Sequence, residues 1–384
     1  MTQPKPPSPP SVRRAQPRTW LCLAALVVAC GGGDPRDRGH DAGPQSPDEE
    51  LLGGRGSNPR DASTTDASRG VAQAPDGGTD GAAAEADASF DRLEDTGLEA
   101  LDVPECLADL FVDPESLREL VSDLSGATEV VIDGESVRID ERTSTEGRAR
   151  ARAYLRDRYL ALGYEVTEHV YATGANLVAE RAGDDEAFFV VSAHLDAVPG
   201  SPGADDDASG LATGFAVAAA LEDCDLAHTL RLVAFDEEER GIVGSLAYAT
   251  SVYTNGADRV LGMIQLEMTG YDSDHDGAYL LVHCDMPGDL AIANTVIAAV
   301  GTLELPLGHR RFCTGASDHQ AFWLYGFPAI AMGEFFFSFE DQSPGDPNPC
   351  YHASCDTADA LDYEYMADLT TATALAVATL VGAR

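Results

Sequence analysis

The sequence predicts one α/β domain with a central mixed, largely parallel β-sheet that is flanked by helices on both faces. From about residue 100 onward, apolar runs of strand length alternate with longer amphipathic stretches, which is the pattern of strands connected by helices. Several of these runs, such as residues 188–193, are apolar at almost every position, as is typical of strands covered on both faces. With 44% hydrophobic residues, the 384-residue chain can bury a sizeable core.

The expected elements follow one another along residues 99–384, which we take as the folded domain. Strands are expected at residues 164–171, 176–180, 188–194, 230–235, 260–266, 279–283 and 328–332. Helices are expected at residues 147–162, 208–221, 241–253, 290–300 and 363–381. In sheets of this kind, ligands bind beyond the carboxyl ends of the strands. The loops that follow these strands are therefore where a functional site is expected.

The N-terminal segment has the features of an export signal. Residues 1–20 carry four basic side chains and no acid, and the apolar run 20–29 is too short to span a membrane comfortably. The run ends at Ala29-Cys30, which looks like a bacterial lipobox. We expect residues 1–29 to be a lipoprotein signal peptide and Cys30 to carry a lipid anchor in the bacterial cell envelope. An ordinary signal peptide cleaved near Ala29, with secretion of the chain, is the alternative.

Residues 30–98 are expected to form a disordered tether. Gly, Ala, Ser, Pro and Asp dominate the segment, Phe90 is its only aromatic residue, and no apolar periodicity is present. A flexible coil of this length has a root-mean-square reach of roughly 45 Å. Such a tether would hold a lipid-anchored domain away from a membrane surface.

The charge of the chain excludes several classes of function. There are 25 Lys and Arg against 65 Asp and Glu, a formal net charge of -40, so a nucleic acid is not an expected partner. Lys5, in the predicted leader, is the only lysine. Chemistry that needs a lysine amine, such as a Schiff base or a nucleotide-binding P-loop, is therefore excluded from the folded domain.

Acidic residues and histidines gather in the loops after the predicted strands. The segments concerned are His194-Leu-Asp196, the run Asp205-Asp206-Asp207, Asp236-Glu-Glu-Glu239, Glu267, and the later loop 350–357 with His352. Carboxylates concentrated at one edge of a sheet repel one another unless cations neutralise them. Imidazole together with carboxylates suits zinc, whereas calcium would not favour imidazole.

These segments, together with Ser317-Asp-His319 and Tyr351-His352, resemble the dizinc aminopeptidases of metallopeptidase clan MH, the bacterial leucyl-aminopeptidase type, from about Arg142 to the C-terminus. The resemblance implies a phosphorylase/hydrolase-like sheet and two Zn²⁺ ions per chain. It implies that His194 binds the first zinc, that Asp206 bridges both, and that Glu239 and His352 complete the second. Glu267 stands where the family commonly has Asp as the remaining ligand of the first zinc. We still expect ligation there, with altered metal spacing or amine binding as a consequence.

The resemblance also implies catalytic roles. Glu238 would be the general base that takes a proton from a metal-activated water and passes it to the leaving amine. Asp196 would orient the His194 imidazole, Tyr351 could donate to the developing oxyanion, and Ser317 would orient Glu267. The expected substrates are peptides with a free N-terminus and commonly an apolar first side chain, hydrolysed by a monomeric domain. His319 is expected to be structural or to line a pocket.

Other functions remain as alternatives. A glutaminyl cyclase-like transferase with one zinc shares the fold and most ligands, and a non-catalytic surface binding protein could have kept the fold. Carboxypeptidase or dipeptidase specificity is a further alternative among hydrolases. The segment Asp272-Ser-Asp274-His-Asp276 begins like a calcium-binding EF-hand loop, but its twelfth position is His283 instead of Glu, so calcium is not expected.

Six cysteines lie in the predicted domain, and export with an even count favours disulfide bonds. Cys350 with Cys355 is the preferred pair, because Cys-Tyr-His-x-x-Cys-Asp occurs in part of the family that the chain resembles. The other four cysteines allow three pairings, of which Cys106 with Cys224 and Cys284 with Cys313 is one. A thiolate zinc site is not favoured, since no Cys-x-x-Cys pair is present.

Overall fold

The computed structural model describes residues 96–256, 259–336 and 345–384. The predicted signal peptide, Cys30 and nearly all of the predicted tether lie outside these residues, so the boundaries at residues 29 and 98 stay predictions. Among the described residues, none of the helices has both the length and the apolar character needed to cross a membrane.

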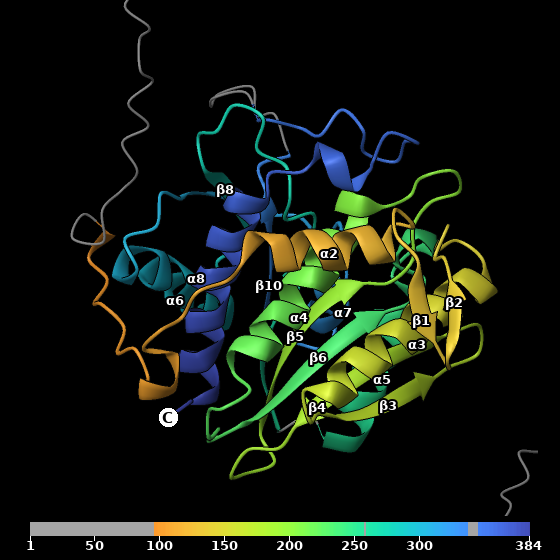
Figure 1. Ribbon diagram of the computed structural model, residues 1–384. Helices are drawn as coiled ribbons and strands as arrows, with labels where there is room; N and C mark the ends of the chain where they lie inside the picture. The colour runs from red at the N-terminus through yellow and green to blue at the C-terminus, as the bar shows by residue number, and fades with distance from the viewer. Residues whose placement is uncertain (1–95, 257–258, 337–344) are drawn as a thin grey trace, which may run out of the picture. The chain divides into compact units, whose positions relative to one another are not determined.

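An eight-stranded mixed sheet forms the centre of the domain, with the strand order β3-β4-β6-β5-β7-β10-β8-β9 (Figure 1). Its strands are β3 (Glu165–Val170), β4 (Ala175–Arg181), β5 (Phe188–His194), β6 (Thr229–Phe235), β7 (Val260–Leu266), β8 (Ala278–Val282), β9 (Gly308–Phe312) and β10 (Ala329–Glu334). The four central strands β6, β5, β7 and β10 are parallel, and β3, β4 and β8 pair with a neighbour in the antiparallel sense. The predicted mixed, largely parallel sheet is confirmed.

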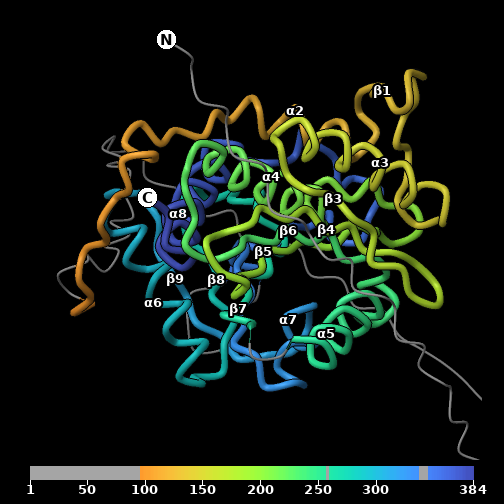
Figure 2. The backbone as a smooth tube through the Cα atoms, turned by 90° about the horizontal axis from the view of Figure 1, so that it is seen from below, coloured from red at the N-terminus to blue at the C-terminus, as the bar shows by residue number. Residues whose placement is uncertain are grey.

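Helices cover both faces of this sheet. They are α2 (Pro114–Leu124), α3 (Thr145–Ala161), α4 (Gly210–Ala220), α5 (Val243–Gly256), α6 (Pro287–Thr302), α7 (His319–Trp323) and α8 (Tyr363–Val381). Helices α3, α4, α6 and α8, with α2 packed on α4 and α8, form the larger core, and α5 and α7 form a smaller core on the opposite face (Figure 2). Alternate residues of β5 enter the two cores, Phe189 and Val191 on one side and Phe188 and Val190 on the other, which explains why this strand is apolar throughout.

The five predicted helices and seven predicted strands are all present, with ends that differ by a few residues. The segment expected to begin a helix at residue 208 instead contains an irregular turn, Ala204–Ser209, and α4 starts at Gly210. The structure also contains α2, α7, β9 and the small hairpin of β1 (Val130–Ile132) and β2 (Glu135–Val137), which the sequence patterns did not predict. Strand β9, Gly-His-Arg-Arg-Phe, is an edge strand that is mostly only half-buried, so it lacks the apolar run that revealed the others.

Three disulfides fix the loops around this framework. They join Cys106 to Cys224, Cys284 to Cys313 and Cys350 to Cys355. The structure therefore contains the preferred pair and resolves the pairing of the other four cysteines that the sequence left open. Three disulfides indicate that the domain resides in an oxidising compartment, either outside the cell or in the periplasm.

Candidate active site

The candidate site lies where the central parallel strands end. His194 is the last residue of β5, Asp236 follows β6 and Glu267 follows β7. Because these strands are parallel neighbours, their carboxyl ends meet at one edge of the sheet. The strand order thus brings together the residues that end β5, β6 and β7, although they are far apart in the sequence, as the strand-end pattern predicted.

Two groups of side chains in this region have the geometry to hold metal ions, and they share Asp206. One group contains His194, Asp206 and Glu267, and the other contains Asp206, Glu239 and His352. Oδ1 of Asp206 lies 2.9 Å from Nε2 of His194, and Oδ2 lies 3.1 Å from Nε2 of His352. Each oxygen of the shared carboxylate therefore faces one group. The structure brings all five predicted ligand residues together, and their role as ligands stays a prediction.

Two further observations indicate that these side chains are suited to bind metal ions. Nε2 of His194 and Oε1 of Glu239 are buried side-chain atoms without a hydrogen-bond partner, and both belong to the two groups. Burial, followed by the nearby carboxylates, raises the pKa of Glu239 to about 7 and that of Glu238 to about 10. Carboxylates that lie close together and are shielded from water are costly to ionise. Bound cations would stabilise their charged form.

The acidic loop is held by acceptors that point at its backbone. Asp356 accepts hydrogen bonds from the N–H groups of Asp205 (2.8 Å) and Asp206 (3.2 Å). Asp207 accepts from the N–H of His194 (2.9 Å) and of Met268 (3.2 Å), which ties the loop to the ends of β5 and β7. Of the three consecutive aspartates, only Asp206 belongs to the two candidate metal groups.

A buried arginine also holds this loop by hydrogen bonds to main-chain oxygens. Arg142 is completely buried and donates to the carbonyl oxygens of Leu195 (2.8 Å), Gly203 (2.7 Å) and Leu124 (2.7 Å). Burial lowers the pKa of Arg142, while Asp356 and the other acids of the loop act in the opposite direction. The guanidinium supplies positive charge beside a cluster of carboxylates without occupying their metal-facing oxygens.

Asp196 connects the loop after β5 with the loop after β6. Its carboxylate accepts from the N–H groups of Glu238 (2.9 Å) and Glu239 (3.3 Å). Nδ1 of His194 is 3.1 Å from the main-chain oxygen of Asp196 and 3.7 Å from its carboxylate. In this geometry the main-chain carbonyl is the hydrogen-bond partner of the imidazole, and the carboxylate fixes the short helical turn Glu238–Arg240.

The residues before Glu238 are anchored by a buried ion-pair network that the sequence patterns did not predict. Arg148 of α3 lies 2.6 Å from Asp236 and 3.3 Å from Glu237, and all three side chains are at most 2% exposed. Arg152, one helical turn later, lies 2.9 Å from the second oxygen of Asp236. Helix α3 thereby fixes the backbone from which Glu238 and Glu239 extend.

The remaining predicted residues lie at the mouth of a cavity. Oγ of Ser317 donates to Oε2 of Glu267 (2.5 Å), the contact that was expected for this serine. Tyr351 is 53% exposed and its ring stacks on that of His352 at 3.8 Å between centroids. The Cys350–Cys355 disulfide closes the short loop that carries both rings.

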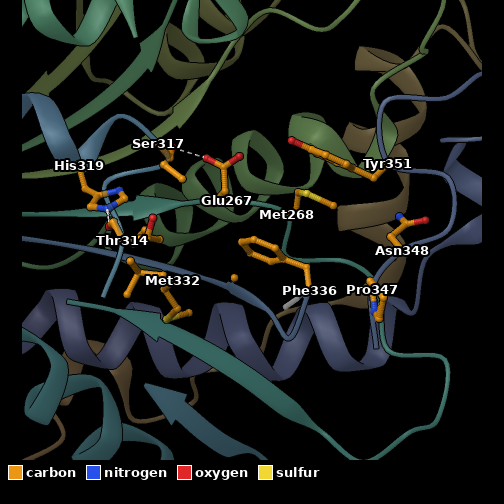
Figure 3. A pocket seen from close by; sticks show the side chains of 14 residues that line it. Glu267, Met268, Thr314, Ser317, His319, Met332, Phe336, Pro347, Asn348 and Tyr351 are labelled. Carbon is orange, nitrogen blue, oxygen red and sulfur yellow. Dashed lines mark hydrogen bonds between the residues drawn. The ribbon is translucent and has the colours of Figure 1, made fainter. Parts of the chain in front are cut away.

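The cavity has a volume of about 290 Å³ and extends from Glu267 and Tyr351 into the protein. Figure 3 shows Tyr351 and Asn348 at one side of the view, His319 and Thr314 at the other, and Glu267 between them. Its lining includes Met268, Val282, Ala331, Met332 and Phe336. Such a small, mostly apolar space beside the candidate metal groups can hold one side chain of a bound molecule.

A separate acidic group lies in the loop between β7 and β8. Carboxylate oxygens of Asp272, Asp274 and Asp276 are within 4.8 Å of one another. Asp272 is buried and accepts from the N–H of Gly277 (3.1 Å), while Asp274 is exposed. The group is open to solvent on one side, and the expectation that it is not an EF-hand calcium site stays a prediction.

Comparison with known proteins gives a family match. The model of "Peptidase family M28" matches residues 176–377, which is more than half of the chain. An uncharacterized protein of Escherichia coli, YfbL, is 27% identical over 255 residues, covering 57% of this chain and 76% of that protein. A probable leucine aminopeptidase 2 of Aspergillus oryzae is 27% identical over 225 residues, covering 54% of this chain. The chain spans only 45% of the length of that aminopeptidase.

Solved structures show the same fold. The LapA aminopeptidase of Legionella pneumophila has a TM-score of 0.60 at 21% identity, with 74% of this chain and 78% of that chain covered. A glutaminyl cyclase of Macrostomum lignano has a TM-score of 0.59 at 17% identity, with 74% of this chain and 95% of that chain covered. The fold is therefore shared by proteins with two different activities, and the choice between them depends on the site.

Proposed function

Because this chain belongs to peptidase family M28, we propose that it is a zinc-dependent aminopeptidase that hydrolyses N-terminal residues from peptides. The observation that carries the proposal is the pair of candidate metal groups that share Asp206. Glu238 interacts with His194, Glu239 and Glu267 of these groups, and Glu267 also lines an apolar cavity. The leucine aminopeptidase among the relatives agrees with this activity.

We infer that two Zn²⁺ ions bind per chain. His194, Asp206 and Glu267 would hold one ion, and Asp206, Glu239 and His352 would hold the other. Imidazole nitrogen and carboxylate oxygen are ligands that zinc accepts. Bound zinc would polarise the scissile carbonyl group and lower the pKa of a water molecule.

The chain's own residues would divide the remaining tasks. Glu238 would act as the general base, because its backbone is fixed by Asp196 and it belongs to neither candidate metal group. The proton that its carboxylate takes up would pass to the leaving amine. The hydroxyl group of Tyr351, at the mouth of the cavity, would donate to the oxygen on which negative charge develops.

Exopeptidase action requires a partner for the free α-ammonium group and a place for the first side chain. Glu267 lines the cavity, and an oxygen of its carboxylate could accept from the ammonium group. The apolar cavity beside Glu267 would take the first side chain of the peptide. Carboxypeptidase and dipeptidase specificity are the alternatives that a substrate panel separates.

A glutaminyl cyclase-like transferase with a single zinc is the main alternative, since a cyclase shares the fold. The presence of two complete three-residue groups favours the peptidase. A non-catalytic surface binding protein is the other alternative, and the presence of Glu238, a general-base candidate that interacts with His194, Glu239 and Glu267, argues against it.

We also propose that the protein is exported and anchored to a membrane by a lipid on Cys30. The three disulfides support export, because such bonds persist in oxidising compartments. Expression in a bacterial host with labelled palmitate would test the anchor. Label on the wild-type chain but not on Cys30→Ala is expected, and equal labelling of both would refute the anchor.

The activity is tested with the purified, zinc-loaded protein. We would measure zinc per chain and the hydrolysis of aminoacyl-p-nitroanilides, of the same compounds with a blocked amine, and of substrates with a free C-terminus. Two zinc ions per chain and turnover of free-amine substrates alone are expected. One zinc with cyclisation of N-terminal glutamine would establish the cyclase alternative, and full loading without any turnover would favour a binding protein.

Adjacent variants provide matched controls for the assigned roles. Glu238→Gln should keep both zinc ions and lose nearly all turnover, whereas Glu239→Gln should lose one zinc ion as well. The two substitutions remove the same charge from neighbouring positions, so a general electrostatic effect would make them alike. Full activity of Glu238→Gln would refute the assignment of the base.

A further inference from the structure

The loop that carries Tyr351 and His352 presents both side chains at the surface. Tyr351 is 53% exposed, and the side chain of His352 is 38% exposed. The backbone φ of His352 is 57°, in the left-handed region that a residue other than glycine adopts only where its surroundings hold it. Side chains that are this exposed are not fixed by burial, so the chain on either side must position them.

The disulfide closes this loop without attaching it to the rest of the protein. Cys350 and Cys355 are the first and last residues of what we call the tip, residues 350–355. A bond between them keeps the tip compact, but it would still allow the closed tip to move as one body over the acidic loop, Asp205–Asp207. Other contacts must therefore attach the tip to that loop.

Asp356 attaches the C-terminal end of the tip. Its buried carboxylate accepts from the N–H groups of Asp205 and Asp206, and its own N–H donates to the carbonyl oxygen of Ala353 within the tip (3.1 Å). These bonds fix one end of the tip on the backbone of the acidic loop. A single attachment point would leave the other end free to pivot.

Asn348 attaches the N-terminal end. It is 4% exposed and lies next to Tyr351 in the wall of the cavity (Figure 3). Its Oδ1 accepts from the N–H of Cys350 (2.8 Å), and its Nδ2 donates to Oδ2 of Asp205 (2.7 Å). The N–H of Cys350 can only donate, so the amide oxygen faces Cys350 and the amide nitrogen faces Asp205. One side chain therefore joins the first residue of the tip to the neighbour of Asp206.

The sequence around Asn348 restricts its backbone. The ring of Pro347 fixes the φ of that residue, and Pro349 restricts Asn348 to extended conformations. The carbonyl oxygen of Asn348 accepts from the N–H of Tyr351 (3.1 Å), which starts the turn of the tip. The side-chain amide thus extends from a stiff segment, as a group that positions its neighbours requires.

We propose that Asn348 is a positioning residue that holds the tip in place on the acidic loop, and that it thereby positions both His352 and the hydroxyl group of Tyr351. The inference rests on the proposed aminopeptidase function and adds to it a residue that belongs to neither candidate metal group. Nε2 of His352 lies 3.1 Å from Asp206 and 3.3 Å from Glu239, so even a small pivot of the tip would separate the members of the second group.

The first test measures zinc binding and needs no turnover. In Asn348→Ala, an equilibrium titration should find one of the two zinc sites weakened by about 10–100-fold, the range typical of losing a group that orients a metal ligand. It should be the site that Ser317→Ala leaves intact, because Ser317 holds Glu267 of the other group. The double variant should therefore have two weak sites. Asn255→Ala, which removes an exposed asparagine of α5, is the matched control and should bind zinc as the wild type does.

The second test asks whether Asn348 acts through Tyr351. At saturating zinc, Asn348→Ala should lower kcat for aminoacyl-p-nitroanilides about tenfold with little change in KM, because a displaced oxyanion donor loses part of its effect in the transition state. In a Tyr351→Phe background the same substitution should change kcat by less than about twofold, since the hydroxyl group that it displaces is already absent. A general loss of structure would lower kcat equally in both backgrounds.

Two further measurements keep the inference testable if Asn348→Ala fails to fold. Asn348→Asp keeps the size of the side chain and the bond from Cys350, but it replaces the donor to Asp205 by a second carboxylate, so it should weaken the same zinc site. In the wild type, nitrogen-15 NMR should show that the side-chain NH₂ of Asn348 exchanges with solvent more slowly than that of Asn255.

The outcomes separate the inference from the function on which it rests. Wild-type zinc affinities in Asn348→Ala, one strong site in the double variant, or an equal loss of kcat in both Tyr351 backgrounds would overturn the inference and leave the aminopeptidase standing. Equally fast exchange of the two asparagine NH₂ groups would also overturn it. Absence of all turnover in the wild type would remove the proposed function, and the zinc titrations would then decide the inference alone.

Discussion

Arg148 provides the sharpest test of how the site is held in place. Its guanidinium lies 2.6 Å from Asp236 and 3.3 Å from Glu237, and none of the three side chains is more than 2% exposed. Burial raises the pKa of Asp236, and Arg148 and then Arg152 oppose this effect, so the two arginines offset part of the cost of burying its charge. In Arg148→Met, Asp236 would keep Arg152 and Glu237 would keep Arg240, a partner that is half exposed.

Removing one partner of a buried ion pair lowers the free energy of unfolding by about 3–5 kcal/mol. Because Asp236 and Glu237 each keep another arginine partner, we expect a loss of about 3 kcal/mol for Arg148→Met. Arg150→Met is the matched control, since Arg150 belongs to the same helix and pairs with the exposed Glu146. That pair should contribute less than about 0.5 kcal/mol.

The assay is urea unfolding followed by far-ultraviolet circular dichroism, with all variants at the same zinc concentration. Because Asp236 and Glu237 directly precede Glu238, folded Arg148→Met should also lose turnover below its unfolding transition, whereas Arg150→Met should not. If the free energies of unfolding of the two variants differed by less than 1 kcal/mol, the network would not be the anchor that we describe.

The disulfides, Ser317 and Asp272 give three further predictions. The disulfides close loops of 118, 29 and 5 residues, so replacing each pair by serines should cost about 5, 4 and 2 kcal/mol of unfolding free energy in that order. Loss of Cys350–Cys355 should nevertheless reduce activity most, because it frees His352, and retained activity there would contradict the assigned ligand. Ser317→Ala should weaken one of two zinc sites by about 10–100-fold in an equilibrium titration, since it removes the hydroxyl that orients Glu267, with the exposed Ser136→Ala as control. Burial, then the neighbouring Asp276 and Asp274, raises the pKa of Asp272 to about 6, so the unfolded chain ionises first and wild-type stability should fall as pH rises from about 4 to 6. Asp272→Asn keeps an acceptor for Gly277 and should gain stability over the wild type across that range, and a difference that does not change with pH would contradict this reasoning.

The sequence predicted the sheet and the position of the site because both depend on local patterns. A strand that is buried on both faces must be apolar along its whole length, so β5 could be recognised without knowledge of its neighbours. The residue that ends such a strand must lie at the edge of the sheet, which is why His194 could be expected beside Glu267. The bridging position of Asp206 was different, since only the family resemblance selected it from three consecutive aspartates.

The support of the site could not be predicted in the same way. Helix α3 carries arginines at positions 148, 150, 152, 156 and 158. From the sequence alone, all five would be expected on the exposed side of the helix. Packing against the loop after β6 makes Arg148 and Arg152 buried and leaves Arg150 exposed. Arg142 is similar, because its partners are main-chain carbonyl groups that leave no signature in the sequence. Contacts to backbone groups far along the chain are set by tertiary structure.

The departure at position 267 has a physical explanation in the surroundings of that residue. Glutamate is one methylene longer than the aspartate that the resembling family commonly has, yet Oε1 of Glu267 still lies 3.5 Å from Nε2 of His194. The other oxygen is held by Ser317 at 2.5 Å and by the side-chain amide of Gln265 at 3.3 Å. These two donors hold Oε2 of Glu267 away from the imidazole. Oε1 is thereby directed toward His194, even though the side chain is longer.

The three consecutive aspartates show how so many acids can be buried at one place. Asp205 accepts from the N–H of Gly270 and from Asn348, and Asp207 accepts from the N–H groups of His194, Gly210 and Met268. These two carboxylates are therefore satisfied by donors of the protein. Asp206 instead faces the imidazoles of His194 and His352, which lower its pKa against the effect of burial. Of the three carboxylates, it is the one that belongs to the two candidate metal groups, so it is the position where bound cations would be held. The two candidate metal groups contain the carboxylates of Asp206, Glu239 and Glu267, so they account for little of the net charge of -40.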